Sequence, residues 1–415
     1  RLGGRGFIHR FMSIEENANQ VSRVKRAQSF IIDRPYTIEP DRTIADARNM
    51  VAQYGVSGLL VVAGDGTLRG VLSSRDFFLA RDGGDLVSDV MTPREKLIVG
   101  TPQTTFEGAR DVFLKEKIEK LPLVDENNRV VGLITSADIE NVVRYPLANT
   151  DQNGRLVVGG SVGVHGDYLE RAQELVKAGA DVLVIDIAHG HSDLMFQAIK
   201  NVRDVCGSVQ LVAGNIATVE AARELCEAGV DALKVGIGPG ATCITREVTG
   251  CGVPQLTAIL QTAEMAKKYG VPIIADGGIQ KSGDIVKALG AGADSVMIGS
   301  LFAGTHESPG VIMKRDGKKY KIYRGSASMG VAQKRKSIDQ EKKDLENVVP
   351  EGIEAIVPYK GPIEDMIREL VGGLRSGMSY TNSRTIEELQ SNAEFMQITS
   401  AGKRESGPHD VGDMK

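Results

Sequence analysis

A thiol in a glycine-rich loop is the group in this sequence that is best placed to do chemistry. The loop reads Gly-Ile-Gly-Pro-Gly-Ala-Thr-Cys-Ile-Thr over residues 236–245, so Cys243 follows the glycines and Thr245 lies two positions after it. Because glycine lacks a Cβ, the backbone can approach a ligand closely and point amide or carbonyl groups at it. A cysteine in such a loop is placed to act as a nucleophile. We therefore predict that Cys243 is catalytic.

Three polar side chains follow other short apolar runs of the sequence. Asp186 and Asp276 come directly after such runs, and Asn215 comes one residue later than a third. In a parallel α/β barrel the active site forms where the strands end. We therefore expect these three side chains to lie in one site with the Cys243 loop.

Two consecutive glycine-containing loops indicate a phosphate site. Gly277-Gly278 and Gly299-Ser300 each follow an apolar run and open a helical pattern. Backbone N–H groups at such helix starts bind phosphate, and Asp276 beside them could accept the two hydroxyls of a ribose. The alternative is that the loops are tight turns with a capping aspartate. Their position beside the Cys243 loop favours a nucleotide monophosphate site.

A repeated phrase indicates the elements that position these residues. The phrase is Ala-Gly-x-Asp, where x is Ala or Val, and it begins the segments 178–185, 228–235 and 291–298. Each phrase follows a helical pattern and continues into an apolar strand. Helices alternating with continuous apolar strands are typical of a parallel sheet covered by helices. Polar residues follow nearly every strand, which favours a (β/α)₈ TIM barrel over an open sheet. One barrel strand is expected to precede residue 1.

A second kind of repeat lies in the N-terminal third of the chain. Gly-Val-Leu-Ser-Ser-Arg-Asp-Phe at 70–77 matches Gly-Leu-Ile-Thr-Ser-Ala-Asp-Ile at 132–139. A repeat of about 60 residues suits a pair of small α/β modules, and it resembles a tandem cystathionine-β-synthase (CBS, or Bateman) pair. That resemblance implies a regulatory purine nucleotide site with Asp76 and Asp138 at ribose hydroxyls. Helix capping is the alternative for both aspartates.

These patterns predict how the chain divides. We expect residues 1–28 to be the N-terminal part of the barrel, 29–149 an inserted CBS pair, and 150–415 the rest of the barrel. Within the last part we expect a flap at about 326–356 and a C-terminal segment that contributes to a cation site.

Composition gives no sign of a nucleic-acid or membrane partner. The formal net charge is −4, charged residues make up 25% of the chain, and the longest apolar runs have the length of strands. Four cysteines without paired spacing indicate a reducing compartment, and we expect a cytoplasmic protein.

Taken together, the motifs resemble the IMP dehydrogenase / GMP reductase family along nearly the whole chain. The resemblance lies in Gly-Phe-Ile-His-Arg at 6–10, Asp-Ile-Ala-His-Gly-His-Ser at 186–192, Gly-Asn-Ile at 214–216, residues 236–246, Ala-Asp-Gly-Gly at 275–278, Val-Pro-Tyr-Lys-Gly at 357–361, Gly-Gly-Leu-Arg-Ser at 372–376 and Arg-Glu-Ser-Gly-Pro-His-Asp at 404–410.

The resemblance implies a role for each candidate residue. Cys243 would add to C2 of a purine nucleotide, GMP or IMP, and hydride would pass between C2 and NADPH or NAD. Thr245 would position or activate water or ammonia. Substrate would be held by Asp276, Gly278, Gly299, Ser300, Tyr323 and Ser326, with Glu351 at the purine edge, and the nicotinamide cofactor by Asp186, Asn215 and Gly236. A K⁺ site would use Gly238, Gly240 and Cys243 with Glu405, Ser406 and Gly407 of a neighbouring chain, which implies a homotetramer or an octamer.

The sequence departs from the family pattern in the flap, and this bears on the reaction. Dehydrogenases carry an Arg-Tyr pair there, whose arginine is the base for water attack, whereas this chain has Asp339-Gln340 and no Arg-Tyr between residues 331 and 343. Ala241 also replaces a usual serine, and Ser326-Ala327 replaces Met-Gly. We predict a GMP reductase. The alternatives are an IMP dehydrogenase, with Arg335 or a flap lysine as base, and a catalytically silent nucleotide sensor.

Overall fold

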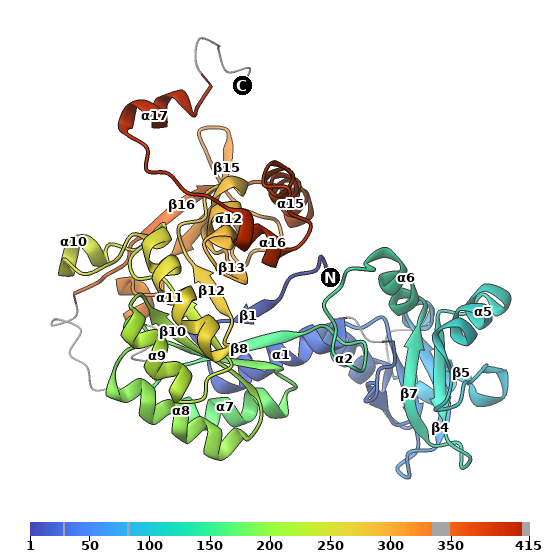
Figure 1. Ribbon diagram of the computed structural model, residues 1–415. Coiled ribbons are helices and arrows are strands. Elements are labelled where there is room, and N and C mark those ends of the chain that lie inside the picture. The colour runs from blue at the N-terminus through green and yellow to red at the C-terminus, as the bar shows by residue number, and fades with distance from the viewer. Residues whose placement is uncertain (28–29, 81–83, 334–348, 409–415) are drawn as a thin grey trace. The chain divides into compact units, whose positions relative to one another are not determined.

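The computed structural model describes residues 1–27, 30–80, 84–333 and 349–408 (Figure 1). The chain forms two compact units, each described here by itself. One holds Arg1–Ile8, Ile14–Gly160 and Glu174–Asp181, and the other holds His9–Ser13, Ser161–Gln173 and Val182–Lys415. The division predicted from the sequence at residues 28/29 and 149/150 stays a prediction.

A parallel sheet of seven strands forms the framework of the barrel. Its strands, in sheet order, are β1 (Gly6–Ile8), β8 (Val158–Val162), β9 (Val182–Asp186), β10 (Gln210–Ile216), β11 (Ala232–Val235), β12 (Ile273–Asp276) and β13 (Ser295–Met297). The registers of β1 with β8 and of β9 through β13 are all parallel. Strand order follows chain order without reversal, which is the connectivity of a barrel rather than of a doubly wound sheet.

Helices alternate with the strands, as the repeated phrase predicted. They are α7 (Tyr168–Lys177), α8 (Asp193–Cys206), α9 (Val219–Glu227), α11 (Gln255–Tyr269), α12 (Ser282–Gly290) and α13 (Ser300–Ala303). Figure 1 shows α8, α9 and α11 on the outer side of the curled sheet. In α8 the buried residues Met195, Ala198, Ile199 and Val202 recur at helical spacing, so one apolar face covers the strands.

The repeated Ala-Gly-x-Asp phrase has a structural cause. Its glycines Gly179, Gly229 and Gly292 have φ of 99°, 82° and 108°, which side chains with a Cβ rarely adopt. Asp231 accepts a hydrogen bond from the N–H of Leu211 at 2.7 Å, and Asp294 from Ile273 at 2.7 Å. Each aspartate thus satisfies a backbone donor near the start of a sheet strand.

The internal repeat folds as two modules of similar order. The first contains β2 (Thr37–Ile38), α2 (Ile44–Tyr54), β3 (Gly58–Val62), β4 (Leu68–Ser73), α3 (Ser74–Leu79), α4 (Val87–Val90) and β5 (Thr92–Pro93), and the second contains α5 (Phe106–Glu116), β6 (Lys120–Val124), β7 (Val130–Thr135) and α6 (Ser136–Arg144). Each module has its own core. A further cluster, with Leu60 and Leu68 from the first module and Val124 and Leu133 from the second, joins the modules. α1 (Ile14–Ala27) precedes them.

Asp76 and Asp138 cap the helices that follow the matched strands. Asp76 accepts hydrogen bonds from the N–H and hydroxyl of Ser73, both at 2.7 Å, and Asp138 from those of Thr135 at 3.0 and 2.5 Å. Burial raises the pKa of Asp138, against the hydrogen bonds from Thr135. The capping interpretation is therefore satisfied at both positions, and a regulatory nucleotide contact stays a prediction.

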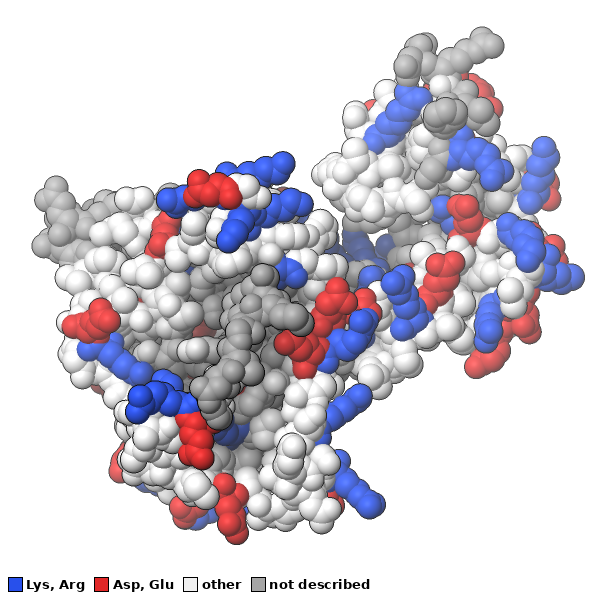
Figure 2. Space-filling view, turned by 90° about the horizontal axis from the view of Figure 1, so that it is seen from above, with Lys and Arg blue, Asp and Glu red and all other residues white. Residues whose placement is uncertain are grey.

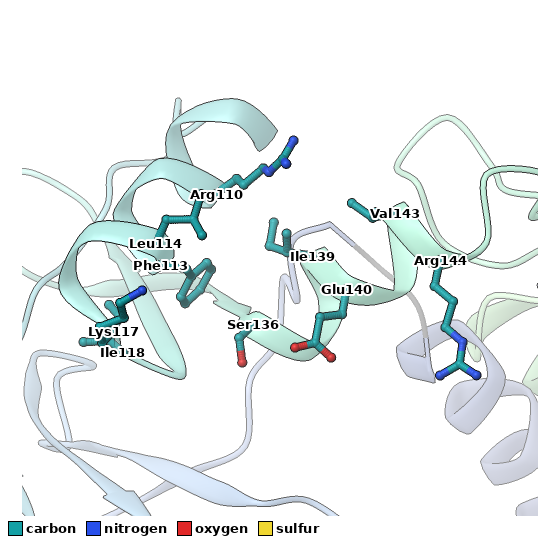
Figure 3. Close-up of a pocket in the computed structure, with 10 residues that line it drawn as sticks. All are labelled: Arg110, Phe113, Leu114, Lys117, Ile118, Ser136, Ile139, Glu140, Val143 and Arg144. Atoms are coloured by element: carbon teal, nitrogen blue, oxygen red, sulfur yellow. The ribbon is translucent and has the colours of Figure 1, made fainter.

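A groove of about 510 Å³ lies between α5 and α6 of the second module. Figure 3 shows apolar side chains, among them Phe113 and Ile139, between the two helices, with Arg110 and Arg144 among the lining residues.

Figure 2 shows Lys and Arg interspersed with Asp and Glu on the face in view. Within the described ranges, no helix combines the length and apolarity needed to cross a membrane.

The C-terminal part adds a small antiparallel sheet and helices. The sheet contains β14 (Met313–Arg315), β15 (Lys318–Arg324) and β16 (Glu354–Pro358), and the helices are α15 (Ile363–Tyr380), α16 (Ile386–Asn392) and α17 (Ser400–Glu405). β15 ends just before the segment predicted to be the flap, at about 326–356, and β16 begins within its last residues. The flap residues Arg335 and Asp339-Gln340 lie outside the described residues.

Candidate active site

The Cys243 loop connects β11 to the short helix α10 (Thr245–Thr249). Its first glycine, Gly236, has φ 149°, and a Cβ there would lie 2.1 Å from the carbonyl oxygen of Asp276. Only glycine permits this approach without displacing the backbone. The absence of a side chain at Gly236 therefore brings the cysteine loop against the end of β12.

Cys243 begins a chain of three hydrogen-bonded side chains. Its Sγ donates to Oγ1 of Thr245 at 3.2 Å, and that hydroxyl donates to Oε2 of Glu351 at 2.7 Å. The backbone fixes this alignment, because Ile244 N–H donates to the carbonyl of Glu351 at 2.8 Å and Cys243 pairs with Gly352. The arrangement offers a route by which a proton can leave the thiol and reach a carboxylate.

Four strand ends bring a second polar cluster together around Lys234. The lysine Nζ lies 2.9 Å from Oδ1 of Asp186 and 2.5 Å from Oδ2 of Asp276, and it donates to Oδ1 of Asn215. The amide of Asn215 in turn donates to Oδ2 of Asp276 at 3.0 Å and to the carbonyl of Gly236 at 2.7 Å. The predicted residues Asp186, Asn215 and Asp276 thus meet in one network.

Lys234 is the member of this network that sequence reasoning missed. Its side chain is 4% exposed, and a lysine inside an apolar strand was the available signal, since such a charge needs partners. Burial by itself lowers the pKa of Lys234, but the charges of Asp276 and Asp186 outweigh it and hold the pKa above its ordinary value. The lysine is therefore an ammonium group at neutral pH.

The predicted phosphate loops converge near the same place. Gly278 has φ 81°, and a Cβ on its neighbour Gly277 would lie 2.8 Å from Pro239 of the cysteine loop. A Cβ at Gly299, the residue before Ser300, would lie 3.2 Å from the hydroxyl of Tyr323. Burial raises the pKa of Tyr323, so its phenol stays a neutral hydrogen-bond donor at neutral pH.

The remaining predicted residues lie in two places. Ser326 follows Gly325, where a Cβ would lie 2.9 Å from Oγ1 of Thr242, so this turn borders the cysteine loop. Glu405 ends α17, and Ser406 N–H donates to the carbonyl of Gly402 at 3.0 Å. The cation site predicted from Gly238, Gly240 and Cys243 with these C-terminal residues of a neighbouring chain stays a prediction.

Comparison with known proteins decides the family. A model described as the IMP dehydrogenase / GMP reductase domain matches residues 1–409. The chain belongs to this family. Inosine-5'-monophosphate dehydrogenase of Nitrosopumilus maritimus is 48% identical over 99% of this chain and 87% of its own length. The Bacillus subtilis enzyme is 47% identical over 99% and 84%.

A solved structure resembles the fold along the same length. A variant GMP reductase from Trypanosoma brucei, crystallised with guanosine 5'-monophosphate, has a TM-score of 0.92 and 44% identity, covering 99% of this chain and 86% of that one. The TM-score and the family together confirm the predicted TIM barrel. They also confirm the predicted class of enzyme, an oxidoreductase that interconverts purine nucleotides at IMP.

Proposed function

We propose that this protein is a GMP reductase, which converts GMP, NADPH and a proton to IMP, NADP⁺ and ammonia. The observation that carries the proposal is the hydrogen-bonded chain from Cys243 through Thr245 to Glu351. It can take the thiol proton and return it to a leaving amine, which is the proton transfer that this reaction needs. The flap sequence supports the same direction, because it lacks an Arg-Tyr pair.

The first half of the reaction replaces the amino group of GMP by the cysteine sulfur. As Cys243 Sγ bonds to C2, its proton passes to Thr245 Oγ1 while the hydroxyl proton of Thr245 moves to Glu351. The C2–N bond then breaks, and the proton held on Glu351 returns through Thr245 to the departing amine, which leaves as ammonia. Atoms balance, because the NH₂ group and the thiol proton together make NH₃.

The second half restores the cysteine. NADPH, when bound, supplies the hydride that C2 receives. The C2–S bond then breaks, IMP is released, and the sulfur takes up the one proton that the overall reaction consumes. Residues Asp186, Asn215 and Gly236 fit the nicotinamide side because Asp186 remains partly exposed, at 37% of its side chain, with one oxygen directed to Lys234.

The substrate would be oriented by the neighbouring loops. Asp276 offers carboxylate oxygen to the ribose hydroxyls of GMP, and the backbone N–H groups at Gly278, Gly299 and Ser300 would receive its phosphate, with Tyr323 donating from the side. Ser326 would lie at the base. The convergence of Gly277 on Pro239 and of Gly299 on Tyr323 supports this arrangement.

IMP dehydrogenase is the second candidate, and the similar relatives favour it, since eight such enzymes are 46–49% identical to this chain. In that direction Thr245 and Glu351 would activate water to release the covalent intermediate as XMP. The flap sequence argues against it, because lysine does not reproduce the geometry of an arginine base.

Absorbance at about 340 nm separates these functions. The protein is incubated with GMP and NADPH, then with IMP and NAD⁺, in K⁺ buffer. We expect loss of NADPH with GMP and no growth of NADH with IMP. Growth of NADH with IMP would make the protein a dehydrogenase, and silence in both assays would make it a nucleotide sensor. Ammonia release in step with NADPH loss is the confirming measurement.

We also propose how the protein assembles and is regulated. The predicted K⁺ site shares residues between chains, so it requires a homotetramer or a pair of tetramers. The two repeat modules resemble a CBS pair that binds a purine nucleotide through Asp76 and Asp138. Their joined core supports the view that they act as one regulatory unit, and a cytoplasmic location is proposed with them.

A further inference from the structure

Lys234 connects the two carboxylates that are proposed to bind the two riboses. Its Nζ lies 2.9 Å from Asp186, assigned to the nicotinamide side, and 2.5 Å from Asp276, assigned to the substrate side. We infer that Lys234 is a positioning residue that fixes both carboxylates and couples the binding of the two nucleotides. The inference deepens the proposed function and depends on its assignment of the two ribose subsites.

The sheet register makes this bridge possible. Gly214 pairs with Asp186 of β9 on one side and with Lys234 of β11 on the other. A Cβ on Gly214 would lie 2.5 Å from Cβ of Lys234 and 2.6 Å from its carbonyl oxygen. Because this position carries no side chain, β10 can approach β11 closely and the ammonium group can reach across it to Asp186.

The donors of the ammonium group are matched to its surroundings. A lysine has three N–H donors, and Asp186, Asp276 and Asn215 provide three acceptors. One oxygen of each carboxylate contacts the lysine, and Asn215 holds the same Asp276 oxygen at 3.0 Å. The second oxygen of each carboxylate takes no part in these contacts with Lys234, and we assign it to the ribose hydroxyls.

This arrangement links the two subsites in energy. A ribose bound at Asp276 limits the motion of that carboxylate and of the ammonium group attached to it, which also orders Asp186. The ordering is then already complete when the second nucleotide binds, so each ligand should increase the affinity of the other. Without the lysine, two carboxylates would face one another with no positive charge between them, and both subsites would weaken.

A binding experiment tests this without depending on turnover. The full chain carries Cys243→Ala so that no chemistry occurs, and the Kd of IMP is measured by calorimetry with and without saturating NADP⁺. In this background we expect saturating NADP⁺ to lower the Kd of IMP by about fivefold or more. With Lys234→Met added, the Kd of IMP measured without NADP⁺ should rise by about tenfold, and NADP⁺ should no longer change it. Lys234→Arg keeps the charge, so it should recover part of the IMP affinity and part of the effect of NADP⁺.

A second buried lysine provides the matched control. Lys25, 5% exposed, also bridges two aspartates, Asp151 at 3.1 Å and Asp181 at 2.6 Å, but has no proposed ligand. We expect Lys25→Met to lower the melting temperature and to leave IMP affinity and coupling unchanged. Equal IMP affinity and coupling with and without Lys234→Met would overturn the inference, as would a background protein in which NADP⁺ does not affect IMP. If Lys234→Met does not fold, the Arg variant decides by the same two measurements.

The two proposals fail in different ways. IMP is a ligand in either reaction direction, so NADH formation from IMP by the protein with Cys243 intact would overturn the reductase and leave the Lys234 measurements valid. In that intact protein Lys234→Met should raise KM for both nucleotides more than it lowers kcat. A loss confined to melting temperature would instead mark a merely structural lysine.

Discussion

At the scale of single residues, the proposed mechanism depends on groups that are connected to one another by hydrogen bonds. Cys243, Thr245 and Glu351 form one hydrogen-bonded chain, so in the proposed proton transfer each residue acts only if the next is in place. Removal of one member should therefore cost nearly as much as removal of two.

Replacement of Cys243 by alanine should abolish turnover in either direction and leave IMP binding within about threefold of wild type, because the sulfur forms the bond to C2 but does not hold the ribose or phosphate. Steady-state absorbance and calorimetry measure the two effects. Cys251→Ala, at an exposed thiol eight positions later, is the control and should retain full activity. Turnover by the Cys243 variant would refute the covalent mechanism.

Thr245→Val and Glu351→Gln should each lower kcat by about 10²–10⁴-fold, the usual contribution of a positioned acid–base group. KM for GMP should change little, since Thr245 is not assigned to the ribose or phosphate and Glu351→Gln keeps an amide of the same shape at the purine edge. Thr249→Val removes a hydroxyl from the same helix that donates to the carbonyl of Thr245 and accepts from the N–H of Cys251, but contacts neither Cys243 nor Glu351, and it should keep most activity. Additive losses in the double variant would show that the two residues do not form one relay.

At the scale of elements, glycines decide where loops and strands approach, and helix caps order the repeat modules. Gly236 and Gly214 allow contacts that a Cβ would prevent, whereas Gly229 only needs its positive φ. These roles predict different outcomes for the same substitution.

Gly236→Ala should abolish GMP binding and turnover, because its Cβ would lie 2.1 Å from the carbonyl oxygen of Asp276. Gly229→Ala also puts a side chain at positive φ, 82° against 149° at Gly236, but the new methyl group has open space around it. It should cost about 1 kcal/mol of unfolding free energy and keep wild-type kcat. Chemical denaturation and the NADPH assay distinguish the two, and a fully active Gly236 variant would contradict the packing of this loop.

Asp138→Asn should keep or increase stability at pH 7. Burial raises the folded pKa of Asp138 above its unfolded value, so the stability linked to this carboxyl is full below the unfolded pKa of about 3.9 and is lost as the pH rises through the folded pKa. The amide keeps an acceptor for Thr135 without the charge. Chemical denaturation from pH 4 to 8 should show the free energy of unfolding of Asp138→Asn increasing relative to that of wild type as the pH rises. Asp138→Ala loses the helix cap and should lower the free energy of unfolding by about 1 kcal/mol. A variant that loses stability toward pH 8 would show that the charge is favourable.

At the scale of the whole molecule, the proposed cation site ties catalysis to assembly. If Glu405 to Gly407 of one chain complete the loop of another, sedimentation should give a mass of four chains or eight. Exchange of K⁺ for a large organic cation should lower kcat by about tenfold or more, and Glu405→Ala should raise the K⁺ concentration for half-maximal activity. A monomer that turns over at full rate without K⁺ would exclude this assembly.

The sequence determined the kind of framework, and it predicted which residues lie at the ends of its strands. The repeated Ala-Gly-x-Asp phrase could be recognised because its glycines need positive φ and its aspartates bond a neighbouring strand, and both needs are local. Asp186, Asn215 and Asp276 could be found because parallel strands end at one edge of the sheet. The family was predicted from the resemblance of the motifs to those of its known members, and the family model that matches residues 1–409 confirms it.

Only the tertiary structure decided how those residues are connected. Glu351 lies more than a hundred positions from Thr245 along the chain, and no periodicity in the sequence shows that the two bond at 2.7 Å. Lys234 looked like one polar residue in an apolar strand until the register placed it between two carboxylates across the bare backbone of Gly214. The reason is physical: residue types and local spacing determine strands and turns, whereas a buried charge acquires its partners only when strands from distant parts of the chain lie side by side.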